Sequence, residues 1–285
     1  MCTTCGCSDG AEPRVTDLVG DPARHVHAQE HDHAHEHPHA HGHDPHHHGH
    51  DHHPHQHQPA PASIEARREV RTIRLEQDLL AKNDQLAERN RRWLDAQGIV
   101  ALNLMSSPGA GKTTLLERTI HDLRSEIPIC VIEGDQETSR DAERIRATGC
   151  RVVQINTGSG CHLDADMLSA GVAKLAPPSG SLLLIENVGN LVCPALFDLG
   201  ERAKVVIMSV TEGEDKPVKY PHMFRVSDVM VLNKLDLLPH VHFDVESGIA
   251  FARQVNPRLE VVIVSATRGD GLDRWYGWLR SQRTF

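Results

Sequence analysis

Ser106-Ser-Pro-Gly-Ala-Gly-Lys112-Thr113 joins an apolar run at 99–105 to a helical pattern at 112–124, and this stretch decides the fold. It differs from the phosphate-binding pattern G-x-x-x-x-G-K-S/T only at its first position, where Ser106 stands in place of glycine. Where a strand leads into a helix, exposed backbone N–H groups and the helix dipole converge on a bound phosphate. We therefore expect a nucleotide site here, and a glycine-rich turn without a ligand is the alternative.

Two side chains of this loop have expected roles in chemistry. Lys112 is expected to reach the β- and γ-phosphates as a catalytic residue, and the Thr113 hydroxyl to coordinate Mg²⁺. The loop residues expected to contact the nucleotide are Gly109, Ala110, Gly111, Lys112, Thr113 and Thr114.

Outward from this loop, continuous apolar runs alternate with helical patterns over residues 64–285. This alternation predicts an α/β domain of the P-loop NTPase kind, with a mainly parallel sheet flanked by helices on both faces. The expected strands are 99–105, 129–132, 152–155, 182–185, 205–210, 229–232 and 261–264. The expected helices are 64–97, 112–124, 139–148, 164–175, 244–255 and 270–282.

Asn233-Lys234-Leu-Asp236 follows the strand expected at 229–232 and predicts recognition of guanine. In an N-K-x-D loop the Asp carboxylate accepts hydrogen bonds from guanine N1–H and N2–H₂, a donor pair that adenine lacks, so we expect GTP rather than ATP. Ser265-Ala266-Thr267, after the last strand, is similar to the loop whose backbone N–H contacts guanine O6. Taken alone, N-K-x-D also fits a surface turn; the order of the three motifs at strand ends favours the nucleotide site.

Two carboxylates are candidates for catalysis. Glu186-Asn-Val-Gly189 ends the strand at 182–185, where GTPases usually carry D-x-x-G, and Gly189 is placed to sense the γ-phosphate through its N–H. Asp135 closes the strand at 129–132. We expect Asp135 to bind Mg²⁺, and either Asp135 or Glu186 to position the attacking water. Solvated carboxylates at strand ends are the alternative for both.

The head of the chain has a different composition. Seventeen of the 22 histidines lie between His25 and His57, and residues 1–62 carry 2 basic and 9 acidic side chains, a net charge of −7. Only 15 of these 62 residues are apolar, so the head cannot bury enough surface to offset its chain entropy. We expect a disordered head with a cysteine motif at 1–8, a histidine tract at 25–57 and a linker at 58–63.

Charge and hydropathy also exclude classes of partner. Residues 63–285 carry 28 basic and 30 acidic side chains, so no basic excess indicates nucleic acid, and the acidic head argues against anionic membranes. No apolar run approaches the 18 residues or so of a membrane span, and the N-terminus does not resemble a signal peptide. We therefore expect a cytoplasmic protein without nucleic-acid or membrane partners.

Cysteine and histidine occur in three patterns typical of metal ligands. Cys2, Cys5 and Cys7, together with the nearby α-amine, offer a tight N/S site for Ni²⁺, for which opportunistic zinc binding is the alternative. The tract from His25 to His57 offers many weak imidazole sites suited to Ni²⁺ storage, and an inert spacer is the alternative. Cys161, His162 and Cys193 suit Ni²⁺ or Zn²⁺, with water or a second subunit completing the site. Merely buried cysteines are the alternative for the last group.

Several longer stretches resemble the HypB family, the GTPases that deliver nickel during maturation of nickel–iron hydrogenases. The resemblance covers residues 64–285 and the first seven residues. It rests on 80–84 (LAKND), 103–114 (NLMSSPGAGKTT), 133–138 (EGDQET), 160–162 (GCH), 186–193 (ENVGNLVC) and 213–217 (GEDKP).

The resemblance implies a P-loop GTPase that forms a nucleotide-dependent homodimer. It further implies a metal site at Cys161, His162 and Cys193, a tight nickel site at Cys2, Cys5 and Cys7, and two partners, the metallochaperone HypA and the precursor of the hydrogenase large subunit. The expected cofactors are GTP, Mg²⁺, Ni²⁺ and Zn²⁺.

Two other functions stay open at this point. The related urease-maturation GTPase also joins a G domain to a histidine-rich head, although the cysteine cluster at 2–7 and Cys193 favour the hydrogenase branch. A metal-storage protein whose G domain is only a dimerisation switch is the rival from another class.

Overall fold

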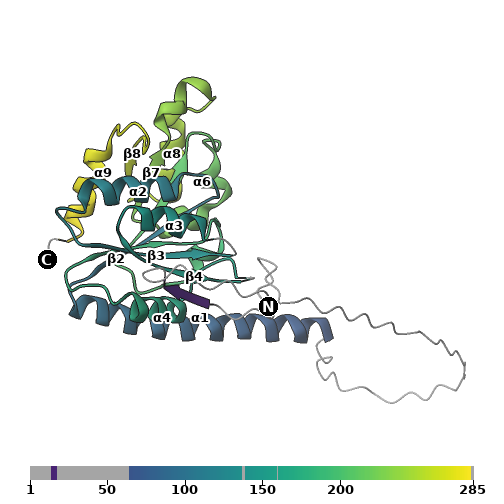
Figure 1. Cartoon of the computed structure of the whole chain (residues 1–285). Coiled ribbons are helices and arrows are strands. Elements are labelled where there is room, and N and C mark those ends of the chain that lie inside the picture. Colours follow the sequence, from purple (N-terminus) through teal and green to yellow (C-terminus); the bar gives the residue numbers. More distant parts are fainter. Residues whose placement is uncertain (1–13, 18–63, 137–138, 159, 284–285) are drawn as a thin grey trace, which may run out of the picture. The chain divides into compact units, whose positions relative to one another are not determined.

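The computed structural model describes residues 14–17, 64–136, 139–158 and 160–283 (Figure 1). Cys2, Cys5, Cys7, the tract from His25 to His57 and the linker at 58–63 lie outside the described residues. The chain divides into two units, of which residues 21–74 form one. The other unit contains residues 75–285 and the first 20 residues, and it carries every feature discussed below.

An eight-stranded sheet with the order β1-β4-β3-β5-β2-β6-β7-β8 forms the centre of this unit. Its strands are β1 (Arg14–Asp17), β2 (Val100–Ser106), β3 (Ile129–Asp135), β4 (Arg151–Asn156), β5 (Leu182–Glu186), β6 (Ala203–Ser209), β7 (Val229–Asn233) and β8 (Glu260–Ile263). All neighbouring strands run parallel except β1, which is antiparallel to β4. The seven expected strands and the mainly parallel sheet are confirmed.

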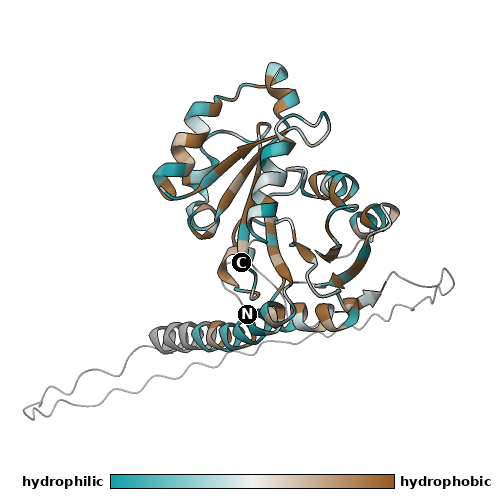
Figure 2. Cartoon of the chain, turned by 90° about the vertical axis from the view of Figure 1, so that its left-hand side faces the viewer, coloured by the Kyte–Doolittle hydropathy of each residue, from teal (hydrophilic) through white to brown (hydrophobic). Residues whose placement is uncertain are grey.

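Helices cover both faces of the sheet because alternate strand residues point to opposite sides. Val100, Leu102 and Leu104 of β2 pack into a cluster with α2, α3 and α9, whereas Ala101 packs with α1 and α4. On the same side as α1 and α4, the β6–β7 half of the sheet is covered by α7 and α8. In Figure 2 the strands are mostly hydrophobic and the helices show both characters, as expected for a sheet covered on both faces.

The longer helices agree with the expected ones within three residues at each end. They are α1 (Ile64–Ala96), α2 (Lys112–Leu123), α3 (Arg140–Ala147), α4 (Ala165–Leu175), α8 (Val245–Val255) and α9 (Leu272–Ser281). The short α5 (Cys193–Leu196), α6 (Lys216–Lys219), α7 (Pro221–Val226) and the 3₁₀ helix η1 (Leu235–His240) were not expected, because one turn leaves no periodic pattern. No helix in the described ranges combines the length and the apolar character that crossing a bilayer requires.

Strand β1 corrects one expectation. The head was expected to be disordered throughout, yet Arg14–Asp17 pairs with Val153–Asn156 of β4. Val15 is partly buried and packs against the apolar cluster under α4, and its carbonyl accepts a hydrogen bond from Lys174 Nζ at 2.8 Å. The physical reason is the edge of β4: its unpaired N–H and C=O groups accept any short extended segment with one apolar side chain.

Candidate functional site

A cavity of about 520 Å³ opens beyond the carboxyl ends of β2, β3 and β5. In open parallel sheets, ligands bind at this position, where the chain crosses to opposite sides of a central strand. Its walls are the loop at 106–114, the end of β3, two residues of α3 and the loop after β5. The lining residues include Gly109, Ala110, Gly111, Lys112, Thr113, Thr114, Asp135, Glu186 and Gly189, all expected from sequence.

The N-K-x-D loop is hydrogen-bonded to the phosphate loop. Asn233 Nδ2 donates to the Ala110 carbonyl at 3.1 Å, and its Oδ1 accepts from the Ala266 N–H at 3.1 Å. Lys234 Nζ donates to the Gly109 carbonyl at 2.5 Å. Asn233, expected as a nucleotide contact, therefore also joins the phosphate loop to the loop at 265–267, and Lys234, likewise expected, contacts the phosphate loop.

Gly111 has no room for a side chain. Its φ is +92°, and a Cβ would lie 2.5 Å from Asn233 Nδ2. Gly111→Ala should therefore push the phosphate loop away from Asn233 and weaken GTP binding more than tenfold, as measured by calorimetric titration.

A matched control separates this contact from backbone strain. Gly149 also has a positive φ, of +82°, but nothing lies within 4 Å of a Cβ built there. Both alanine variants should lose roughly 1 kcal/mol of folding free energy from the left-handed conformation. Only Gly111→Ala should lose nucleotide affinity, and an equal loss in Gly149→Ala would contradict the contact.

Glu186 is buried against the phosphate loop. Its Oε1 accepts from Thr113 Oγ1 at 2.7 Å and lies 3.3 Å from Lys112 Nζ. Burial raises the pKa of Glu186, although the Lys112 charge and the Thr113 hydrogen bond oppose the rise. The predicted catalytic pair of Lys112 and Glu186 is thus in direct contact.

Glu133 is a residue of this cavity that the sequence analysis missed. It lies on β3 two residues before Asp135 and is 2% exposed. Burial and the negative charges of Glu186 and Asp135 raise the pKa of Glu133 to about 9. The signal was visible in the sequence as a charged residue continuing an apolar strand, but the expected strand ended at residue 132.

The two buried glutamates fit a divalent cation. Among the described residues, Glu133 Oε2 and Glu186 Oε2 are buried without a hydrogen-bond partner. Carboxylate oxygens are ligands that Mg²⁺ prefers, and a cation bound here would favour the ionised form of both glutamates. Asp135 and the Thr113 hydroxyl line the same cavity.

A second, smaller cavity of about 290 Å³ lies beside the first. It is lined by Gly111, Thr114, Asn233, Lys234, Asp236, Leu237, Ala266 and Thr267. Asp236 Oδ1 accepts from Ser265 Oγ at 2.6 Å, and this hydrogen bond lowers the pKa of Asp236. The carboxylate is therefore ionised at neutral pH and can only accept hydrogen bonds, as guanine N1–H and N2–H₂ require.

Gly189 allows the loop after β5 to pass close to the phosphate loop. A Cβ at this position would lie 3.3 Å from Pro108 Cγ. The loop that starts at Glu186 therefore follows the nucleotide cavity as far as Gly189, which also lines it.

Cys161, His162 and Cys193, of which the last is far from the other two in the sequence, form one cluster. Their ligand atoms all lie within 4.8 Å of one another, and both cysteines are buried. The His162 ring stacks on Phe197 with the ring centroids 3.9 Å apart. Burial lowers the pKa of His162 despite the opposing charge of Asp164, which favours the neutral imidazole that binds metals.

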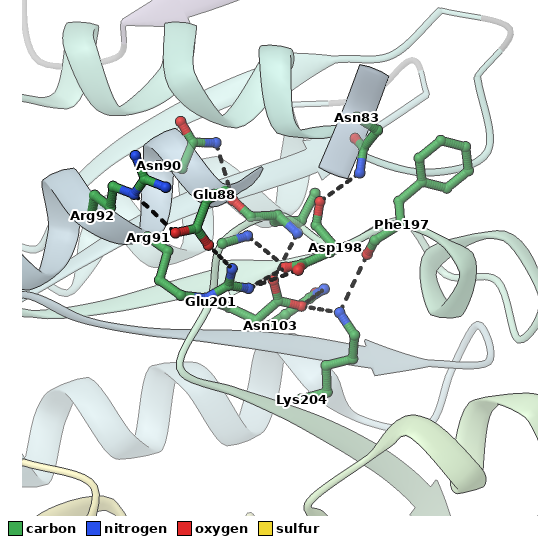
Figure 3. A network of polar contacts seen from close by, with 12 residues as sticks. Asn83, Glu88, Asn90, Arg91, Arg92, Asn103, Phe197, Asp198, Glu201 and Lys204 are labelled. Atoms are coloured by element: carbon green, nitrogen blue, oxygen red, sulfur yellow. Dashed lines mark hydrogen bonds and ion pairs between the residues drawn. The ribbon is translucent and has the colours of Figure 1, made fainter. Parts of the chain in front are cut away.

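Asn187 connects the two sites. It follows Glu186, and its Oδ1 accepts from the backbone N–H of Leu163, which follows His162, at 3.1 Å. Its Nδ2 donates to Asn103 Oδ1 at 3.1 Å. Asn103 Nδ2 in turn donates to Glu201 Oε1 at 3.1 Å, a bond that Figure 3 shows. One hydrogen bond therefore links the residue after Glu186 to the residue after His162.

The class of protein follows from these features. A phosphate loop at the carboxyl end of a central parallel strand, supported by an N-K-x-D loop, defines a P-loop protein that binds and hydrolyses nucleoside triphosphates. Comparison with known proteins agrees: residues 100–263 match the nucleotide-binding domain of the CobW/HypB/UreG family.

Curated relatives narrow the family. The hydrogenase maturation factor HypB of Rhizobium leguminosarum is 61% identical over 209 residues, 73% of this chain and 70% of that protein. The HypB of Escherichia coli K12 is 57% identical over 213 residues, 75% of this chain and 73% of that protein. The chain belongs to the HypB family of hydrogenase maturation factors within the CobW/HypB/UreG proteins.

Solved structures of HypB proteins share the fold. The crystal structure of HypB from Archaeoglobus fulgidus has a TM-score of 0.67 and 45% identity, and the alignment covers 72% of this chain and all of that one. The HypB of Helicobacter pylori, crystallised in complex with nickel, has a TM-score of 0.67 and 36% identity over 71% of this chain and 95% of that one.

Proposed function

We propose that this protein is a cytoplasmic GTPase that binds nickel and delivers it to the precursor of the hydrogenase large subunit. The observation that carries the proposal is the hydrogen bond from Leu163 N–H to Asn187, because it joins a three-ligand metal cluster to the loop around the nucleotide cavity. Nickel is the cargo in this proposal, and the crystal structure of a nickel-bound relative supports the choice of metal. Zn²⁺ is a second occupant that the same ligands suit.

Each residue of the nucleotide site has its own role in GTP binding and hydrolysis. Lys112 holds the β- and γ-phosphates, Asp236 selects guanine, and Asp135 or Glu186 orients the attacking water. Thr113 and Asp135 would hold Mg²⁺, which would neutralise charge on the phosphates. The partnerless oxygens of Glu133 and Glu186 support a cation at this position.

Other parts of the proposal rest on the family. The cysteines at 2, 5 and 7 hold one nickel ion tightly, and the tract from His25 to His57 stores more. The HypA metallochaperone is the proposed partner in transfer, and a GTP-dependent homodimer is the proposed active form. The Cys161, His162 and Cys193 cluster supplies three ligands, so a second subunit or water would complete a four-coordinate site.

The test is the dependence of nickel affinity on the nucleotide. The full chain carrying Cys2→Ser, Cys5→Ser and Cys7→Ser retains the cluster thiolates, and nickel–thiolate absorbance then reports the cluster without interference from imidazoles. Because a metal site tolerates changes of only about 0.2 Å in ligand distances, movement of the loop at 186–193 on hydrolysis should alter the affinity. We expect the nickel Kd to differ by roughly fivefold or more between GDP and a non-hydrolysable GTP analogue.

The same titration contains its control. Cys193→Ser should lose most of the thiolate absorbance with either nucleotide, which assigns the band to the cluster. By linkage, nickel must change the ratio of GTP to GDP affinity by the same factor. Equal nickel affinities in the two nucleotide states would leave a structural metal site, and the proposed gating of transfer by GTP would be wrong.

A further inference from the structure

Helix α1 carries two asparagines that contact the same pair of segments. Asn83 and Asn90 are seven residues apart, which places them on one face of the helix, two turns from each other. Asn83 is 5% exposed and belongs to the LAKND stretch at 80–84. This stretch contains none of the residues expected to bind the nucleotide or a metal. Figure 3 shows both side chains directed toward the segment around Asp198.

Each asparagine bridges two backbones that are far apart in sequence. Asn83 Oδ1 accepts from the Ala165 N–H at 2.9 Å, and its Nδ2 donates to the Asp198 carbonyl at 2.7 Å. Asn90 Nδ2 donates to the Ala165 carbonyl at 2.8 Å and to the Leu199 carbonyl at 3.0 Å. Ala165 is therefore held through both its N–H and its C=O, and the segment 198–199 through two consecutive carbonyls.

These two segments are the continuations of the metal-ligand loops. Ala165 comes three residues after His162 and begins α4. Asp198 comes five residues after Cys193 and directly after Phe197, whose ring stacks on His162. The two asparagines thus span the gap between the loop with Cys161 and His162 and the segment with Cys193.

Other contacts make α1 a rigid support for the second segment. Arg91 Nη2 donates to both carboxylate oxygens of Asp198, at 2.9 and 2.7 Å. Gly200 approaches the helix backbone so closely that a Cβ there would lie 2.4 Å from the Ala87 carbonyl. The backbone around Asp198 therefore cannot shift along α1 without breaking several contacts at once.

We propose that Asn83 and Asn90 are positioning residues for the cluster of Cys161, His162 and Cys193. From their place on α1 they fix the distance between the loop that carries Cys161 and His162 and the segment that carries Cys193. The proposal rests on the proposed metal-binding function of that cluster. Groups that orient metal ligands without touching the metal typically change affinity by about 10–100-fold when they are removed. Here the effect passes through the backbone, because the bridged residues share short loops with the ligands.

The test uses the full chain with Cys2→Ser, Cys5→Ser and Cys7→Ser as background, NiCl₂ as the probe and nickel–thiolate absorbance as the readout. Asn83→Leu has nearly the shape of asparagine but can neither donate nor accept, so both bridges at Asn83 are lost. Asn90→Ala removes the second brace at a side chain that is only half-buried, and it carries the test if Asn83→Leu does not fold. We expect at least a tenfold rise in the nickel Kd for each variant, and a shifted absorbance band.

Asn256→Leu is the matched control for a general loss of stability. Asn256 Nδ2 donates to the carbonyls of Phe224, Arg225 and Ser227 at 3.1, 3.4 and 2.9 Å, so it also bridges several backbone groups, but none of them belongs to the two segments that Asn83 and Asn90 connect. Its substitution should lower the melting temperature and leave the nickel Kd within about threefold of the background.

The outcomes separate the two levels of the proposal. A background chain that shows no nickel–thiolate band would overturn the metal site itself. A background chain with the band, together with Asn83→Leu and Asn90→Ala variants that bind nickel as tightly as Asn256→Leu does, would leave the metal site in place and overturn the role of the two asparagines.

Discussion

Lys112→Ala should reduce the rate of GTP hydrolysis by roughly 100- to 1000-fold, because one preorganised charge is removed from the phosphates in the transition state. The side chain of Lys112 is 12% exposed and starts at the first residue of α2, so its ammonium is fixed at the cavity and is poorly solvated. Its Nζ lies 3.3 Å from Glu186 Oε1. The ammonium of Lys112 therefore already lies in the cavity where we expect the β- and γ-phosphates to bind.

The measurement is phosphate release in a single turnover with Mg²⁺ present. Lys174→Ala is the control, since Lys174 is exposed on α4, its Nζ donates to the Val15 carbonyl and it does not line the nucleotide cavity. The control should keep the hydrolysis rate of the unsubstituted protein. A Lys112→Ala rate within a factor of three of that value would refute the phosphate-loop role.

Asp236→Asn should weaken GTP binding more than tenfold and allow xanthosine nucleotides to compete. The carboxylate can accept from guanine N1–H and N2–H₂ together, a charge-assisted pair with a stabilisation of roughly 2–4 kcal/mol. An amide turns one acceptor into a donor that faces a guanine N–H. Xanthine has a carbonyl at that position, and the new donor therefore suits it.

Titration with GDP and with xanthosine diphosphate measures both effects. Asp270→Asn is a suitable control because Asp270 lies on the neighbouring loop, is exposed and does not line the guanine cavity. Its affinities should match those of the unsubstituted protein. If Asp236→Asn kept both its GDP affinity and its discrimination against xanthosine diphosphate, guanine would have to be recognised elsewhere.

The nucleotide site was predictable because each of its motifs is local. Ser106–Thr113, Glu186–Gly189, Asn233–Asp236 and Ser265–Thr267 each follow an apolar strand, and the carboxyl ends of parallel strands meet at one edge of the sheet. Short-range pattern and that geometric rule were sufficient to bring them together. Serine at position 106 in place of glycine does not change the conformation of the loop, because the positive φ values lie at Gly109 and Gly111.

Glu133, Asn187 and strand β1 were beyond this kind of inference. Glu133 becomes a candidate site residue only because β5 places Glu186 beside it in the sheet, where the two residues are paired in register. Asn187 adjoins a recognised motif, but its partners are the backbone of Leu163 and the side chain of Asn103. Arg14–Asp17 becomes a strand only because β4 has a free edge.

The alternation of strands and helices, the phosphate loop and the guanine loop follow from local patterns in this chain, since the periodicity of each segment and the chemistry of each loop are set by neighbouring residues. The closeness of Cys161 and His162 to Cys193, and their support by Asn83 and Asn90, depend on contacts across 31 to 115 residues of sequence. Such contacts form only when α1, α4 and the segment after α5 pack on one face of the sheet. The packing of whole elements, which no single stretch of sequence encodes, is therefore what brings Cys161, His162 and Cys193 together and connects them to the loop that lines the nucleotide cavity.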